Sequence, residues 1–129
     1  AGGLAMLSAL DRDGVDRMLS FNRGRLRAYH NFAPHELLAM VERTQREGHS
    51  LIDGLIVPGA VAIGLALVDL AQRPILAISA AGIADRMPRT RWPEIVAALT
   101  RTRYDIDTML RADLRQAGGK RRTLRRGVR

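Results

Sequence analysis

The hydroxyl of Ser79 is the side chain in this sequence best placed to bind a small molecule. It is the only hydroxyl in a predicted strand over residues 75–81, where it follows Ile78 and precedes two alanines. Side chains alternate across a strand, so Ser79 and Ala81 share one face and Ile78 lies on the other. Small residues in a strand leave room for a closely packed helix or for a ligand near the backbone. Both interpretations stay open at this point.

The remaining polar residues form no catalytic arrangement. Asp105 and Asp107 lie two positions apart in a predicted helix, so their carboxylates point in different directions and do not act on one bond. The glycine-containing segment 59–64 leads into a strand and lacks the lysine of a phosphate-binding loop. His30 and His35 have no third ligand at a supporting spacing. We therefore expect neither an enzyme nor a metal centre, and no cofactor.

Composition restricts the class of protein. The chain has 129 residues, which is the length of one domain, and it contains no cysteine. A disulfide framework, a thiolate nucleophile and a cysteine-based zinc or iron–sulfur site are thereby excluded. The first residues include no basic segment, and no apolar run reaches the length of a membrane span. A cytoplasmic protein without membrane contact is expected.

The net charge of +8 is concentrated at the C-terminus. Residues 120–129 contain six basic residues and no acid, which leaves +2 for the rest of the chain. This distribution predicts a folded domain over residues 1–117 and a basic, disordered tail over residues 118–129. Such a tail either contacts nucleic acid or another acidic surface, or it is only solvated.

The most apolar part of the chain predicts an antiparallel hairpin. Two runs rich in β-branched and small residues, 61–68 and 75–81, are separated by a segment with turn chemistry. Asp69 can accept hydrogen bonds from the backbone of that turn, and Pro74 suits the first residue of a strand. A third strand over residues 49–53 precedes the hairpin. A single buried helix is the alternative for the first run.

Helices are expected on both sides of these strands. Asp11 is a suitable N-cap for a helix that ends near residue 22, with Val15, Met18 and Leu19 buried. Thr90 is a candidate N-cap for the last helix. We expect the segment 23–32 to be an edge strand or an extended loop, and the helices to cover residues 4–10, 11–22, 34–47 (ended by Gly48) and about 92–117 (anchored by Trp92 and ended by Gly118 and Gly119).

The order of these features resembles the C-terminal effector-binding domain of IclR-type bacterial transcriptional regulators. Residues 1–114 share the resemblance, which rests on the segments GGLAMLSAL, RTQREGHS, IVPGAVAIGLALVD and RPILAISAAG. It implies an α/β (α+β) fold: a GAF-like domain whose antiparallel sheet packs with helices, truncated at its N-terminal side. It also implies a small-molecule effector, either an organic acid or an aromatic metabolite. In that family a separate N-terminal winged helix-turn-helix, missing here, reads the DNA.

The resemblance also implies an effector site and an assembly. Two positions that are often polar in the family are occupied here by Ala62 and Ala81, which predicts a larger or more hydrophobic effector. A homo-oligomer, either dimer or tetramer, is expected because an incomplete sheet exposes an edge. The alternative is a domain that only oligomerises and binds no ligand. The effector contacts that the resemblance implies are Ala1, Gly2, Ile52, Asp53, Ala62, Ser79 and Ala81.

Overall fold

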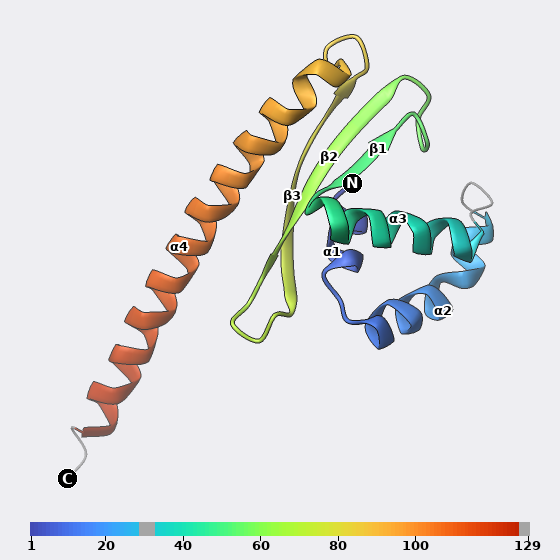
Figure 1. The fold of residues 1–129 in the computed structure, drawn as a ribbon. Helices are drawn as coiled ribbons and strands as arrows, with labels where there is room; N and C mark the ends of the chain where they lie inside the picture. The colour runs from blue at the N-terminus through green and yellow to red at the C-terminus, as the bar shows by residue number, and fades with distance from the viewer. Residues whose placement is uncertain (29–32, 127–129) are drawn as a thin grey trace.

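The computed structural model describes residues 1–28 and 33–126, with side chains up to Asp113. It is an α+β fold in which a three-stranded antiparallel sheet, in the order β1-β2-β3, packs with helices (Figure 1). The predicted hairpin, the preceding strand and the fold class are therefore confirmed. The elements are α1 (Gly2–Ser8), α2 (Arg12–Ala28), α3 (Pro34–Glu47), β1 (Ser50–Asp53), β2 (Ala60–Val68), β3 (Pro74–Ile83), the 3-10 turn η1 (Arg89–Arg91) and α4 (Trp92–Arg126).

Local sequence explains most element boundaries. The carboxylate of Asp11 accepts a hydrogen bond from the backbone N–H of Gly14 (2.7 Å), which confirms the predicted cap of α2. Gly48 ends α3 with a φ of 73°, a left-handed conformation that glycine adopts at little cost. Pro74 is the first residue of β3, where its missing N–H costs no ladder hydrogen bond.

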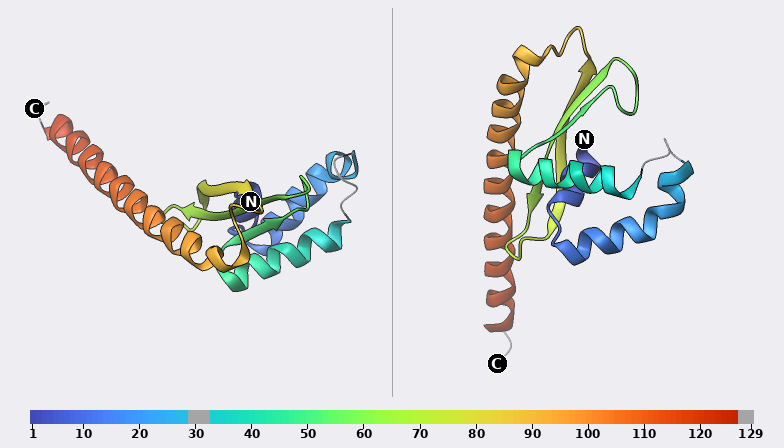
Figure 2. Two further views of the ribbon diagram at one scale, coloured as in Figure 1. Left: turned by 90° about the horizontal axis from the view of Figure 1, so that it is seen from above. Right: turned by 45° about the vertical axis from the view of Figure 1, so that its right-hand side comes forward.

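The two faces of the sheet have different partners. One face carries the buried side chains of β2, and α4 packs on it. The opposite face carries the small residues of β2 and β3, and α1 packs there, with α3 beside β1 (Figure 2). The core against α4 contains Val61, Ile63 and Met87, with Leu51, Ala84, Trp92, Ile95, Val96 and Leu99 packed around them.

Trp92 fixes the start of α4 against the sheet. Its indole N–H donates to the carbonyl oxygen of Met87 (2.9 Å), and the guanidinium of Arg89 lies 5.4 Å from its ring centroid. Met87 in turn lies against Gly82, where an added Cβ would come within 2.9 Å of the methionine sulfur. The expected anchoring by Trp92 is confirmed. The expected cap at Thr90 is wrong, because Thr90 lies inside the turn η1 and makes no capping bond.

Two predicted helix ends are wrong because a weak stop signal does not end a helix that good helix formers continue. α2 runs to Ala28, so the segment up to residue 28 is neither strand nor loop, and residues 29–32 lie outside the described residues. Asn22 stays in the helix and donates to the carbonyl oxygen of Met18, whose side chain is 45% exposed rather than buried. α4 continues through Gly118 and Gly119 to Arg126, although each of the two glycines costs a helix about 1 kcal/mol.

The turn between β2 and β3 is closed by Asp69. Its Oδ1 accepts hydrogen bonds from the backbone N–H groups of Ala71 (2.8 Å) and Arg73 (2.9 Å), and its Oδ2 pairs with the guanidinium of Arg73. The backbone N–H of Arg73, followed by its guanidinium, holds the pKa of Asp69 below its usual range. The turn chemistry predicted for Asp69 is confirmed.

Gln72 in the same turn has a φ of 60°, which disfavours a residue with a Cβ. We expect Gln72→Gly to raise the free energy of unfolding by about 0.5–1 kcal/mol, because glycine adopts this conformation without steric cost. Urea denaturation measures the change. Ala71→Gly is the matched control, since Ala71 has no positive φ and glycine there only adds chain entropy. A destabilised Gln72→Gly variant would contradict the expectation.

Candidate functional site

The small residues of the central strands form rows across one face of the sheet. Ala62 on β2 pairs with Ile52 on β1 and with Ala81 on β3, so their side chains lie on the same face. The pairing of Gly64 with Ser50 and with Ser79 gives the adjacent row. Ser79 and Ala81 are exposed, whereas Ile52 and Ala62 are half-buried. We call the six residues of these two rows the small-residue face: Ser50, Ile52, Ala62, Gly64, Ser79 and Ala81.

The start of α1 occupies part of the small-residue face. A Cβ added to Gly64 would lie 3.0 Å from the carbonyl carbon of Ala1, and the Ser50 hydroxyl donates to the carbonyl oxygen of Ala1 (2.8 Å). A Cβ added to Gly2 would lie 3.6 Å from the Cβ of Ala77 and 4.0 Å from Oγ of Ser79. Close packing of α1 therefore accounts for the missing side chain at Gly64.

The structure brings six of the seven predicted effector contacts to this face. Ala1 and Gly2 lie at the start of α1, next to Gly64 and Ser79. Asp53 is the exception, because it pairs with Val61 and so follows the alternation to the other face. There its Oδ2 accepts a hydrogen bond from the guanidinium of Arg89 (3.2 Å). The residues brought together are Ala1, Gly2, Ile52, Ala62, Ser79 and Ala81.

A cavity of about 360 Å³ lies between α3 and β1. Ile52 belongs both to its lining and to the small-residue face, so the two features meet at β1. Asp53 also lines the cavity. The cavity wall combines apolar side chains with charged and polar ones, and both kinds occur in small-molecule pockets. The apolar lining consists of Leu4, Met40, Leu51, Ile52 and Leu55, and the polar lining consists of Glu36, Arg43, Thr44, Glu47, His49 and Asp53.

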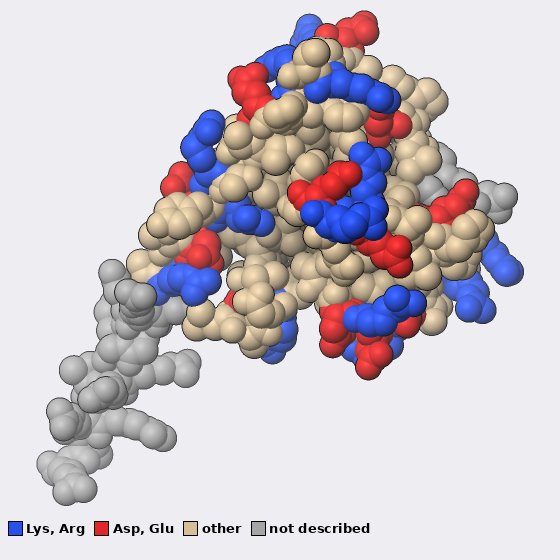
Figure 3. Space-filling model, viewed as in Figure 1, with Lys and Arg blue, Asp and Glu red and all other residues tan. Residues whose placement is uncertain are grey.

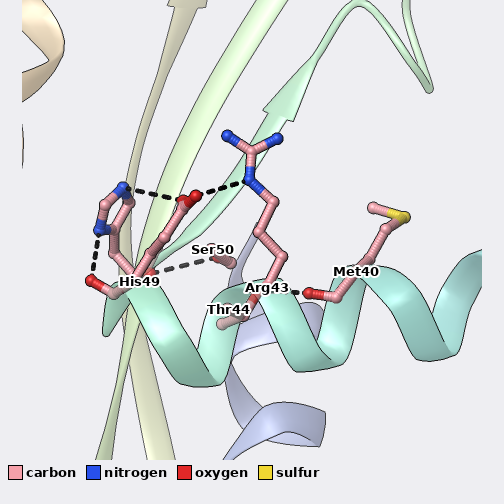
Figure 4. A network of polar contacts seen from close by, with 7 residues as sticks. Met40, Arg43, Thr44, His49 and Ser50 are labelled. Carbon is pink, nitrogen blue, oxygen red and sulfur yellow. Dashed lines mark hydrogen bonds and ion pairs between the residues drawn. The ribbon is translucent and has the colours of Figure 1, made fainter.

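The polar part of this cavity is a network at the end of α3 (Figure 4). Nε of Arg43 donates to Oε1 of Glu47 (2.8 Å), while the two terminal nitrogens of Arg43 point away from the helix. The ring of His49 lies with Nδ1 3.0 Å from the carbonyl oxygen of Glu47 and Nε2 3.9 Å from its Oε2. The network can present a guanidinium edge to an anionic group of a ligand.

Sequence reasoning missed Ser50 and the α3 side of the cavity. Ser50 is completely buried, and besides its bond to Ala1 its Oγ lies 3.2 Å from the carbonyl oxygen of Gly64. A lone serine at the start of a strand gives no signal for this role. The i, i+4 spacing of Arg43 and Glu47 is the one signal of their ion pair in the sequence.

No helix in the described part of the chain has both the length and the apolarity that crossing a membrane requires. Among the residues with described positions, no group of three histidine, cysteine, aspartate or glutamate side chains is arranged to hold a metal ion.

Solved structures share this fold at low sequence identity. An IclR-family transcriptional regulator from Brucella abortus superposes with a TM-score of 0.68 at 20% identity, over 83% of this chain and 41% of that one. An IclR transcriptional regulator from Alicyclobacillus acidocaldarius gives 0.70 at 18% identity, over 82% and 42%. The effector domain of an IclR regulator from Acinetobacter sp. ADP1 gives 0.62 at 14%, over 81% and 61%. No protein-family model and no curated protein matches the sequence.

This chain has the IclR effector-domain fold. The fold predicted from the resemblance is therefore confirmed, and it is shared with proteins that regulate transcription. The chain spans about 41–61% of the length of these solved structures. Within this fold, the small-residue face and the cavity beside α3 are the two described features that suit a ligand.

Proposed function

We propose that the chain is the effector-sensing domain of a bacterial IclR-type transcriptional regulator, cytoplasmic and homo-oligomeric as a dimer or tetramer. Its ligand is a small organic acid or aromatic metabolite, and DNA is read by a separate N-terminal winged helix-turn-helix. The observation that carries the proposal is the convergence of six predicted contacts on one sheet face of this fold. The domain itself performs no reaction.

The ligand is placed over Ala62 and Ala81, with the Ser79 hydroxyl as its polar anchor. Ala62 and Ala81 have small side chains and Ala81 is exposed, whereas Gly64 is covered by Ala1. Gly2 at the start of α1 lies beside Ser79, since a Cβ added there would lie 4.0 Å from its Oγ, and the cavity at Ile52 takes the apolar body of the ligand. The Ser79 hydroxyl beside small side chains, with apolar side chains and the Arg43 guanidinium in the cavity wall, suits an aromatic acid better than a two-carbon acid.

The proposed mechanism is a population shift. An effector that binds one arrangement of the domain more tightly than another moves the equilibrium between them by no more than that difference in affinity. α1 is the element best placed to respond, because it contacts both the small-residue face and α3.

A thermal-shift panel of aliphatic and aromatic carboxylic acids tests the proposal. We expect at least one acid to raise Tm, and Ser79→Ala to weaken its binding by about tenfold or more, because a hydrogen bond to a charged group is lost. Ser20→Ala is the matched control, since Ser20 lies exposed on α2 away from the sheet.

The competing function is a domain that only oligomerises. The close packing of α1 at Gly64 favours it, because that contact explains one small residue without any ligand. No Tm shift with any acid, together with a stable oligomer, would support this function and contradict effector sensing.

A further inference from the structure

The end of α4 leaves the body of the molecule. The last residue of this helix in the core against the sheet is Leu99, and the helix continues to Arg126 (Figures 1 and 2). Both figures show its C-terminal part extending beyond the sheet and the other helices. At 1.5 Å per residue, the 13 residues 114–126 form a helical segment about 20 Å long. We call this segment the α4 arm.

The α4 arm has an unusual charge. All 13 acidic residues of the chain lie within residues 1–113, where they are balanced by 14 basic residues. Figure 3 shows positive and negative side chains interspersed over the viewed face of this part. The α4 arm contains no acidic residue, and its basic residues are Arg115, Lys120, Arg121, Arg122, Arg125 and Arg126. Nearly all of the net charge therefore belongs to the C-terminal end of the chain.

Helical periodicity places most of these basic positions on one side of the backbone. Positions 115, 122 and 126 are separated by seven and four residues, which puts them within one narrow arc of a helix. Positions 121 and 125 are four apart and fall on the neighbouring arc. Positions 115 to 126 span about 16 Å along the helix axis, a length over which duplex DNA carries about ten phosphate charges, one per about 1.7 Å.

We propose that the α4 arm binds the phosphate backbone of duplex DNA without sequence preference. A second copy of the arm is a poor partner because the like charges repel. An anionic membrane requires an apolar helix face to insert, and the only large apolar residues of the arm are Leu114 and Leu124. A protein interface favours aromatic anchors, which the arm lacks. Nucleic acid requires only the charge and its spacing.

The test measures binding of the 129-residue chain to a 20-base-pair duplex of arbitrary sequence by fluorescence anisotropy, at several salt concentrations. Six phosphate contacts predict a slope of log K against log salt of about −5. The test variant carries Arg→Gln at positions 121, 122, 125 and 126. We expect its slope to fall to about −2, since each lost contact removes about 0.9.

The matched control carries Arg→Gln at four exposed positions of α2: 17, 23, 25 and 27. Both variants lose four positive charges. If DNA affinity depended only on the net charge of the chain, both variants would therefore lose affinity equally. We expect the control to keep the slope of the unaltered chain. Equal losses, absence of DNA binding, or tighter binding to phosphatidylserine vesicles than to the duplex would each overturn the proposal. Circular dichroism checks that both variants keep their helices.

Discussion

Ile63→Ala should lower the free energy of unfolding by about 2–5 kcal/mol, because it removes three carbon atoms from a closely packed interior and leaves a cavity. The Ile63 side chain is 0% exposed and lies at the centre of the core between β2 and α4. Urea denaturation followed by circular dichroism measures the change. We expect the variant to retain its helical content at low temperature but to unfold at a clearly lower urea concentration.

Ile75→Ala is the control for this variant. This substitution in β3 removes the same three carbon atoms, but the Ile75 side chain is 47% exposed. Its loss should cost less than about 1 kcal/mol, as is usual for surface positions. If both isoleucines cost the same, α4 does not cover the sheet face that the structure assigns to it.

Gly64→Ala is the second substitution with a large expected effect. It should lower the free energy of unfolding, which is unusual for glycine to alanine in a strand. Alanine normally suits a strand better than glycine. Here the new Cβ would lie 2.9 Å from the Ser50 hydroxyl and 3.0 Å from the carbonyl carbon of Ala1, so the first residues of α1 must shift. We expect a loss of about 1–3 kcal/mol in the free energy of unfolding, the usual cost of overpacking.

Gly24→Ala is the matched control for this substitution. Gly24 lies inside α2, and a Cβ added there meets no atom within 4 Å. The same chemical change should therefore raise stability by about 0.5–1 kcal/mol, since alanine is the better helix former. A Gly64→Ala variant as stable as the unaltered chain would contradict the packing of α1 on the small-residue face.

Short-range chemistry made the sheet predictable. Asp69 and Pro74 mark the turn and the start of β3, and Gly48 marks the end of α3, because each depends on the backbone within a few residues. Helix ends were less predictable, because a single stop residue does not end a helix that good helix formers continue. Gly118 and Gly119 have the right residue type for a stop, yet the surrounding alanine, glutamine and arginine residues continue the helix.

The candidate site could be predicted only in part. Strand alternation correctly places Ser79 and Ala81 on one face, opposite Ile78. The same alternation places Asp53 and Ile52 on opposite faces. The prediction that both residues contact the effector did not take this into account. The contact of Ala1 with Ser50 joins residues 49 positions apart, and no local pattern indicates it. The cavity beside α3 is also formed by residues far apart in the sequence, so no local pattern indicates it.

The central claim is that a small carboxylic acid binds over Ala62 and Ala81 with its polar group at Ser79. Two-dimensional amide NMR of the isotopically labelled chain, titrated with the acid that gives the largest Tm shift, tests it most directly. The claim predicts saturable shifts concentrated at Gly2, Ile52, Ala62, Ser79 and Ala81. Saturable shifts confined to the residues of α4 that pack on the opposite sheet face, such as Ile95 and Leu99, or no shifts with any acid of the panel, would contradict it.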